Sequence, residues 1–175
     1  MGLKPDQSTP AQPRMIEVAI GVLHAAAPAS SGPTATDDSP TPTVTGDTID
    51  TTDSPGPGRV LIARRPADNP LCAGYWELPG GKREPGESLT ACLEREFLEE
   101  LGVRVRVGRL LKRLTHTYDH GTVDLTAFLC THVAGRLQAR EVAEFRWVHP
   151  DELARYRFLP ANGPILEAIR GALTP

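Results

Sequence analysis

The chain has 175 residues and a formal net charge of −3, and this length predicts one domain of ordinary size. Residues 28–58 contain five Asp and no Lys or Arg, so this segment carries −5 and the remaining residues carry +2. A body this weakly basic excludes the concentrated positive charge of a nucleic-acid-binding protein, and no apolar stretch is long enough to span a membrane. The three cysteines lack metal-ligand spacing, which predicts free thiols and a cytoplasmic protein.

The first part of the chain is predicted to alternate between disordered and ordered segments. Residues 1–14 lack the apolar centre of a signal peptide and are predicted to be a disordered extension, with Met15 as an alternative start of translation. Residues 15–23 are rich in β-branched side chains, which predicts a strand. Residues 28–58 are rich in Pro, Thr, Ser, Asp and Gly and are predicted to be a disordered insert, because they have too little apolar surface to offset the cost of ordering.

A second strand is predicted at residues 59–63. The two strands on either side of the insert are therefore expected to form a hairpin whose turn has been expanded. A regulatory or docking segment is the alternative interpretation of the insert.

The second strand leads to residues suited to binding phosphate. Neighbouring residues of a strand point to opposite faces, so at most one of Arg64 and Arg65 faces a site. Arginine suits phosphate because its planar group contacts two oxygens at once, although a solvated strand end is the alternative. After a short loop, Trp76 and Leu78 are expected in the core, and Glu77 between them is expected to face a ligand.

A helix is predicted to begin after Ser88, a suitable N-cap, and to end at Leu101. Gly102 follows in the position where left-handed backbone is common. One face of this helix is predicted to pack on the core and carries four apolar side chains, Leu89, Leu93, Phe97 and Leu101.

Three carboxylates, Glu96, Glu99 and Glu100, lie together on a different face of the same predicted helix. Like charges at this spacing repel one another, so a compensating cation is expected. Oxygen ligands on a rigid helix suit Mg²⁺ or Mn²⁺, which complete their coordination with water and phosphate oxygens. The alternative is an acidic helix end that meets the basic patch of a partner.

The rest of the chain is predicted to be mostly β-strand, with apolar alternation at residues 103–107, 110–118, 123–133 and 143–148. Residues 119–121 are predicted to form a turn. A short helix is expected from Pro150, and an amphipathic helix after Asn162. Three histidines lack metal-ligand spacing and are predicted to be ordinary strand or turn residues: His116, His120 and His132. This order of elements predicts an α+β fold with a mixed sheet between helices.

The stretch from Gly81 to Val103 resembles the signature of the Nudix hydrolases, G-x5-E-x7-R-E-U-x-E-E-x-G-U, where U is a bulky aliphatic residue. All nine specified positions are occupied without a gap, with aromatic Phe97 as the one departure: Gly81, Glu87, Arg95, Glu96, Phe97, Glu99, Glu100, Gly102 and Val103. The resemblance implies the Nudix α/β/α sandwich with a mixed sheet, in one domain over residues 15–175 apart from the insert.

The resemblance also implies roles for individual residues. Metal ligands for Mg²⁺, with Mn²⁺ as an alternative, are implied at Gly81, Glu96, Glu99, Glu100 and Glu144. Glu87 and Arg95 are expected to orient these ligands, and either Glu99 or Glu144 is expected to be the general base. Lys82 is expected to stabilise charge on the phosphates, with an exposed structural lysine as the alternative. Substrate-binding residues are implied at Ile20, Arg65, Glu77, Leu78, Pro79, Gly80 and Asn162.

The similarity to the MutT type implies hydrolysis of a nucleoside triphosphate to a nucleoside monophosphate and pyrophosphate. The expected substrate is 8-oxo-dGTP, whose removal sanitises the nucleotide pool for DNA replication and repair. One alternative is hydrolysis of CTP and 5-methyl-dCTP, because the run LQARE at residues 137–141 resembles that group. Another is a non-catalytic Nudix module that senses nucleotides or reads oxidised bases. We expect a monomer or weak homodimer without nucleic-acid or membrane partners.

Asn162 is the residue on which the predicted choice of nucleobase depends. The run PAN at residues 160–162 resembles the MutT type, in which this asparagine reads the oxidised base. Guanine presents two acceptors, N7 and O6, but in the 8-oxo form N7 bears a proton, so that edge offers a donor beside an acceptor. An Asn side chain has one acceptor and one donor and matches that edge, whereas Asp suits the amine of cytosine. The alternative role for Asn162 is an N-cap of the last helix.

Overall fold

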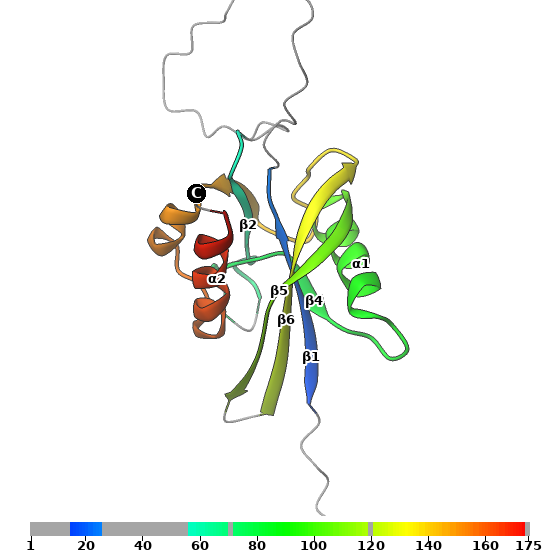
Figure 1. Cartoon of the computed structure of the whole chain (residues 1–175). Coiled ribbons are helices and arrows are strands. Elements are labelled where there is room, and N and C mark those ends of the chain that lie inside the picture. The colour runs from blue at the N-terminus through cyan, green and yellow to red at the C-terminus, as the bar shows by residue number, and fades with distance from the viewer. Residues whose placement is uncertain (1–14, 26–55, 70–71, 119–120, 174–175) are drawn as a thin grey trace, which may run out of the picture.

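The computed structural model describes residues 15–25, 56–69, 72–118 and 121–173 (Figure 1). The predicted extension, most of the predicted insert and two of the three residues of the predicted 119–121 turn lie outside the described residues.

A four-stranded mixed sheet forms the centre of the molecule. Its strands are β4 (Gly80–Lys82), β1 (Ile16–Leu23), β6 (Gly121–Ala134) and β5 (Arg104–Tyr118), in the order β4-β1-β6-β5. β1 runs parallel to β6, and the other two pairs are antiparallel. The predicted mixed sheet is therefore confirmed. The two strands predicted at 103–107 and 110–118 form one long strand, β5, with register shifts around Leu110.

A second sheet of three strands lies beside the first. Its order is β3-β2-β7, with β3 (Trp76–Glu77), β2 (Val60–Arg64) and β7 (Glu144–Val148). The predicted hairpin of β1 and β2 is wrong, because the two strands belong to different sheets. Next to the insert they are linked by an antiparallel bridge of His24 with Val60 and by hydrogen bonds of 3.0 Å from Ala25 N to Arg59 O and of 3.2 Å from Gly58 N to Ala25 O. Beyond that point β1 pairs with β6 along its full length, and β2 pairs with β7.

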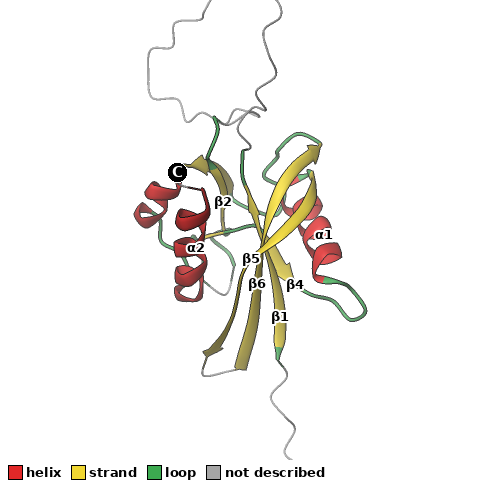
Figure 2. Ribbon diagram, in the orientation of Figure 1, coloured by secondary structure: helices red, strands yellow, loops and turns green. Residues whose placement is uncertain are grey.

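Helices cover the two sides of the sheets (Figures 1 and 2). α1 (Leu89–Leu101) lies on one side, and α2 (Gly163–Leu173) lies on the other with the 3-10 helices η1 (Pro150–Arg155) and η2 (Pro160–Asn162). Both predicted ends of α1 are confirmed: Ser88 Oγ accepts a hydrogen bond of 3.1 Å from Ala91 N, and Gly102 has the left-handed φ of 71°. None of the described helices has the length and apolarity needed to cross a bilayer.

Two hydrophobic cores result, one under each helix. In β1, alternate residues serve the two cores, because successive side chains of a strand point to opposite faces. The α1-side core includes the predicted helix stripe and residues from both sheets: Ala19, Leu23, Leu61, Ala63, Leu93, Phe97 and Leu101. The α2-side core includes the other faces of the same strands: Ile20, Val22, Val60, Ile62, Trp76, Leu78, Ile165, Leu166 and Ile169.

Close packing of α1 on β1 depends on Gly21. A Cβ at this position would lie 2.2 Å from Cε2 of Phe97, whose side chain is fully buried. We expect Gly21→Ala to lower the free energy of unfolding by about 1–3 kcal/mol, because the core has no room for the added methyl group. Urea unfolding measures this change.

A matched control is Gly171→Ala in α2, where an added Cβ meets nothing within 4 Å. This variant is expected to be neutral or more stable by about 0.5–1 kcal/mol, because alanine favours the helix. A Gly21→Ala protein as stable as the control would contradict the proposed packing.

Candidate active site

β4 and the loop that follows it bring backbone atoms close to the carboxylates of α1. In β4, Gly80 N donates a hydrogen bond of 3.2 Å to Oε2 of Glu100. A Cβ at Gly81 would lie 2.2 Å from Oε1 of Glu96, so only glycine lets this carboxylate approach β4. Gly80 has φ 141°, and a Cβ there would lie 2.2 Å from the Ala19 carbonyl oxygen in β1. The two glycines therefore set the distances of β4 from α1 and from β1.

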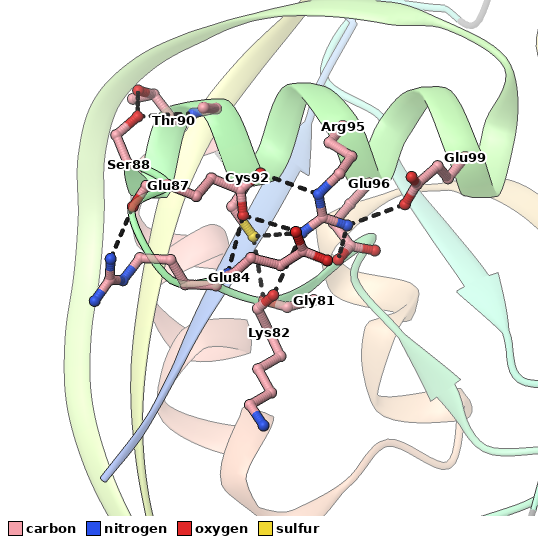
Figure 3. A network of polar contacts seen from close by, with 12 residues as sticks. Gly81, Lys82, Glu84, Glu87, Ser88, Thr90, Cys92, Arg95, Glu96 and Glu99 are labelled. Carbon is pink, nitrogen blue, oxygen red and sulfur yellow. Dashed lines mark hydrogen bonds and ion pairs between the residues drawn. The ribbon is translucent and has the colours of Figure 1, made fainter.

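Arg95 connects this loop to the acidic face of α1 (Figure 3). Its Nε and Nη2 donate to the two oxygens of Glu87 at 3.0 and 3.1 Å. Its Nη1 donates to Glu96 at 2.8 Å and to Glu99 at 3.0 Å. The hydrogen bond from Arg95 lowers the pKa of Glu87, and the bond to Glu87 raises the pKa of Arg95. One guanidinium thus compensates three carboxylates, and the predicted orienting positions of Glu87 and Arg95 lie together.

Glu100 is the most perturbed acid of the group. Burial, followed by the negative charges of Glu77 and Glu96, raises its pKa to about 8. Burial also raises the pKa of Glu96 and of Glu77. Glu141 adds a further negative charge that raises the pKa of both Glu96 and Glu100. The site therefore holds more negative charge than its arginines offset.

Arg65 and Glu77 face this acidic cluster from the three-stranded sheet. Ala63 is paired with Glu77 in the register of β2 and β3, so Arg65, two residues later, points to the same face. Arg65 Nη1 forms an ion pair with Glu77 Oε2, and both side chains are largely buried. Arg64 points to the opposite face and pairs with Glu144 at 2.9 Å. The two arginines therefore point to opposite faces of the sheet, as strand alternation predicted.

Glu144 is not placed with the other predicted metal ligands. It is paired in register with Arg64, on the face of the sheet that carries Trp76 and opposite Glu77. There it contacts Arg64 and, at 3.1 Å, Arg146. The expectation that Glu144 joins the carboxylates of α1 is therefore corrected. Its place in the register of β7 decides its direction, and that register was not accessible from the sequence.

Glu141 is the residue that the sequence analysis missed. Its backbone N lies 3.4 Å from the carbonyl oxygen of Glu100, and Arg140 N donates to the same oxygen at 3.0 Å. These bonds fix the loop before β7 against the end of α1. Glu141 is the last residue of the run LQARE, which was used only as a sign of substrate class. The sequence signal for Glu141 is an acidic residue just before the last strand, whereas the prediction assigned the metal-ligand role to Glu144.

The remaining predicted site residues lie on both faces of the sheets, some on the α1 side and some on the α2 side. The side chain of Lys82 is exposed and points away from α1, while its carbonyl accepts from Arg95 at 3.3 Å (Figure 3). Ile20 and Leu78 are buried together in the α2-side core. Pro79 is buried, and its carbonyl accepts from Gly21 N at 2.8 Å.

Asn162 ends η2 on the α2 side and is only 6% exposed. Its backbone N donates to Leu159 O at 2.9 Å. Within the described part of the chain its side-chain amide has no hydrogen-bond partner, including the first turn of α2. The alternative role as a capping residue therefore has no hydrogen bond to support it. The amide therefore has donor and acceptor capacity left for a ligand.

The side chains as they stand do not converge on one point. Among the described residues, no three acidic, His or Cys side chains are arranged to bind a metal ion together, and Glu96 and Glu99 contact Arg95 instead. The donor set nevertheless fits a hard divalent cation, because it consists of carboxylate and carbonyl oxygens. Burial is the main cause of the raised pKa of Glu100, and the negative charges of Glu77 and Glu96 add to it. A bound cation would offset these charges.

Comparison with known proteins agrees with this geometry. A family model described as a NUDIX domain matches residues 54–168. The CTP pyrophosphohydrolase of Escherichia coli K12 is 39% identical over 111 residues, which cover 63% of this chain and 82% of that protein. The 8-oxo-dGTP diphosphatase of Buchnera aphidicola is 32% identical over 95 residues, which cover 54% of this chain and 72% of that protein.

A solved structure has the same fold over almost the whole chain. The solution structure of the E. coli ORF135 protein matches with a TM-score of 0.66 and 30% identity, covering 92% of each chain. The family model alone covers more than half of the residues, and it includes the full signature from Gly81 to Val103. The chain therefore belongs to the Nudix family of hydrolases and is an enzyme of that family.

Proposed function

We propose that the chain is a metal-dependent nucleoside triphosphate pyrophosphohydrolase that acts preferentially on 8-oxo-dGTP. The observation that carries the reaction type is the acidic cluster of Glu96, Glu99 and Glu100, oriented by Arg95 and faced by Arg65. Removal of an oxidised nucleotide before its use by a polymerase would sanitise the nucleotide pool. The non-catalytic alternative is not favoured, because the carboxylates of the signature are all present.

Divalent metal use is general among Nudix hydrolases, and we assign Mg²⁺ to Glu96, Glu99, Glu100 and the Gly81 carbonyl. A bound cation supplies Lewis acidity at the phosphate oxygens of the substrate. The chain's own contribution is to orient these groups, through Arg95 for Glu96 and Glu99 and through Gly80 N for Glu100.

The general base is assigned to Glu99 or Glu141. The base must accept a proton from the attacking water, so it must be reachable by solvent and close to the phosphates. The side chain of Glu99 is 45% exposed, and Glu141 is exposed beside Glu100. Glu144 does not suit the role of general base, because it is paired with arginines on the other face of the sheet. Arg65, next to Glu77, is positioned to contact a phosphate with its planar group.

The preference for 8-oxo-dGTP is supported by Asn162, whose side-chain amide makes no hydrogen bond with the residues that the structure describes. The protonated N7 and the O6 of 8-oxoguanine would complete its hydrogen bonds, as an acceptor facing a donor and a donor facing an acceptor. A second candidate is a cytosine nucleotide, because the CTP pyrophosphohydrolase of E. coli is 39% identical. Turnover of 8-oxo-dGTP, dGTP, CTP and 5-methyl-dCTP with Mg²⁺, scored for pyrophosphate against phosphate, tests the reaction and ranks the substrates.

The first prediction concerns the metal ligand Glu100. Glu100→Gln keeps the shape of the side chain but removes the charge that faces the cation. We expect a loss of several kcal/mol of transition-state stabilisation, which is on the order of 10³-fold in kcat/KM. The circular dichroism spectrum is expected to be that of the wild type. A folded Gln variant with near wild-type turnover would remove Glu100 from the metal site.

The second prediction concerns the stability of the metal-free protein. The pKa of Glu100 is raised from 4.5 to about 8, so the folded state binds more protons than the unfolded state between these values. Stability from this group is present below pH 4.5 and is lost as the pH rises toward 8. In EDTA, Glu100→Gln is therefore expected to gain stability relative to the wild type between about pH 5 and about pH 8.5, by up to about 1.36 kcal/mol per pKa unit.

Urea unfolding at the two pH values measures this relative gain. The comparison with the Gln variant isolates Glu100 from Glu77 and Glu96, whose pKa values are raised in the same direction. An identical pH dependence for the two proteins would show that Glu100 ionises at its ordinary pKa.

The third prediction concerns base choice. We expect Asn162→Ala to reduce the preference for 8-oxo-dGTP over dGTP by about 1–3 kcal/mol, the contribution of one bidentate pair. Asn162→Asp is expected to shift the preference toward CTP, because an ionised Asp only accepts hydrogen bonds. The measurement is kcat/KM for the three nucleotides in each protein. Unchanged substrate ratios in Asn162→Ala, together with lower stability, would assign Asn162 a structural role.

A further inference from the structure

An ion pair outside the nine specified signature positions joins the loop between β4 and α1, residues 83–88, to the central sheet. Arg83 lies directly after β4, and its Nε donates to Oε2 of Glu17 in β1 at 2.8 Å. Its Nη2 contacts the same carboxylate. The backbone N of Arg83 also donates to the carbonyl oxygen of Glu17 at 2.9 Å. Side chain and main chain of Arg83 are thus both fixed to the same residue of β1.

The same guanidinium also reaches forward into the loop. Arg83 Nη1 donates to the carbonyl oxygen of Glu87 at 2.8 Å. The carboxylate of Glu87 receives the two hydrogen bonds from Arg95 described above, and Arg95 in turn binds Glu96 and Glu99 (Figure 3). A continuous series of hydrogen bonds therefore runs from β1 to the carboxylates of α1.

The loop has few other means of holding this position. Glu84, Pro85 and Gly86 are exposed and bury no apolar side chain, and Gly86 has a φ of 82°, with nothing near its Cα on the side where a Cβ would stand. A loop without apolar burial depends on its polar contacts for a fixed conformation. Inside the loop, Glu84 N donates to Oε2 of Glu87 at 3.1 Å, and Glu87 N donates to Glu84 O at 3.2 Å. Arg83 links the loop to the sheet through Glu17 and also holds the carbonyl of Glu87.

We propose that Arg83 and Glu17 are positioning residues that hold Glu87, and through it Arg95, so that the carboxylates of α1 are ordered before a divalent cation binds. This inference rests on the proposed metal-dependent function. Neither residue is among the nine specified signature positions, so the device belongs to this chain and not to the motif. When the contacts of Arg83 with Glu17 and Glu87 are absent, the free energy needed to order the carboxylates is subtracted from the binding free energy of the cation. Metal affinity therefore falls, while the chemical step at saturating metal changes little.

The test uses Arg83→Met, which keeps the aliphatic stem of the side chain and removes all three of its donors. We expect the Mg²⁺ concentration for half-maximal activity to rise by about 10-fold, the smaller effect typical of mutating residues that hold metal ligands in place. The value of kcat at saturating Mg²⁺ is expected to stay within about twofold of the wild type. The second readout needs no substrate: the increase in Tm caused by Mg²⁺ alone, or by Mn²⁺ alone, is expected to shrink at a fixed concentration.

Three further variants separate the contacts. Glu17→Gln removes the ion pair but leaves the bond from Arg83 to the Glu87 carbonyl, so its effect on the Mg²⁺ midpoint is expected to be smaller. The double variant of Glu17→Gln and Arg83→Met is expected to be no worse than Arg83→Met, because both changes interrupt one series of contacts. Arg83→Lys keeps a cation beside Glu17 and is expected to restore part of the response. Glu17→Gln and Arg83→Lys also carry the test if Arg83→Met does not fold.

Arg113→Met is the matched control. Arg113 pairs with Asp124 of β6, which is the register partner of Glu17, and among the described residues neither forms a hydrogen bond or ion pair with the loop. The charge of Glu17 contributes to the raised pKa of Arg113, so the control also removes a positive charge near Glu17 but leaves the loop contacts in place. Asp124 is only 6% exposed, so loss of its partner lowers stability. We expect a lower Tm with an unchanged Mg²⁺ midpoint and an unchanged metal-induced shift in Tm.

The outcomes distinguish the inference from the function on which it rests. If Arg83→Met behaves like the Arg113→Met control, with lower Tm and a wild-type response to Mg²⁺, the pair is structural and the inference is overturned. If Arg83→Met lowers kcat at saturating Mg²⁺ and leaves the midpoint unchanged, the inference is overturned as well. If the wild type itself shows neither metal-dependent hydrolysis nor a metal-induced shift in Tm, the proposed function fails.

Discussion

The interaction on which the site depends is the contact of Arg95 with three glutamates. Glu96 and Glu99 are only three residues apart on one helix face, and their charges would repel each other without a cation between them. Arg95 supplies that cation from the same helix, and its bidentate contact with Glu87 fixes the direction of the guanidinium. Helix, loop and carboxylates therefore form one unit. Glu100 forms no hydrogen bond or ion pair with Arg95; its burial, followed by the charges of Glu77 and Glu96, raises its pKa to about 8.

The two sheets give this unit its surroundings. β2 and β3 present Arg65 and Glu77 toward the acidic face of α1, whereas their alternate residues, Arg64 and Trp76, face the α2 side. The segment around Glu77 thus has two functional directions. Its charged residue belongs with the carboxylates, and Leu78 belongs with the core against which Asn162 and α2 are placed. In the proposed function, this strand alternation would separate the group that faces the phosphates from the group that faces the nucleobase.

Several features were predictable because they depend on neighbours in the chain. The extent of α1, its Ser88 cap and the left-handed Gly102 follow from local hydrogen bonds and backbone preferences. The shared face of Glu96, Glu99 and Glu100 follows from the helical period. The predicted hairpin of β1 and β2 is wrong because strand pairing depends on segments that are distant in the chain. β1 pairs with β6 along its full length. The choice of Glu144 over Glu141 failed because the register of β7 sets the direction of its side chains.

The sequence by itself determined the family, the α+β class with a mixed sheet, and the carboxylates and arginine of the signature, because each of these is encoded in spacing along one loop and one helix. Only the tertiary structure decided that Glu141 adds its charge to Glu96 and Glu100, that Glu144 faces away, and that Asn162 is a buried residue of the α2 side. It also decided that Arg83 is bound to Glu17, which is 66 residues away in the chain. These contacts join segments that are distant in sequence, so their geometry is set by sheet register and packing and not by any local pattern.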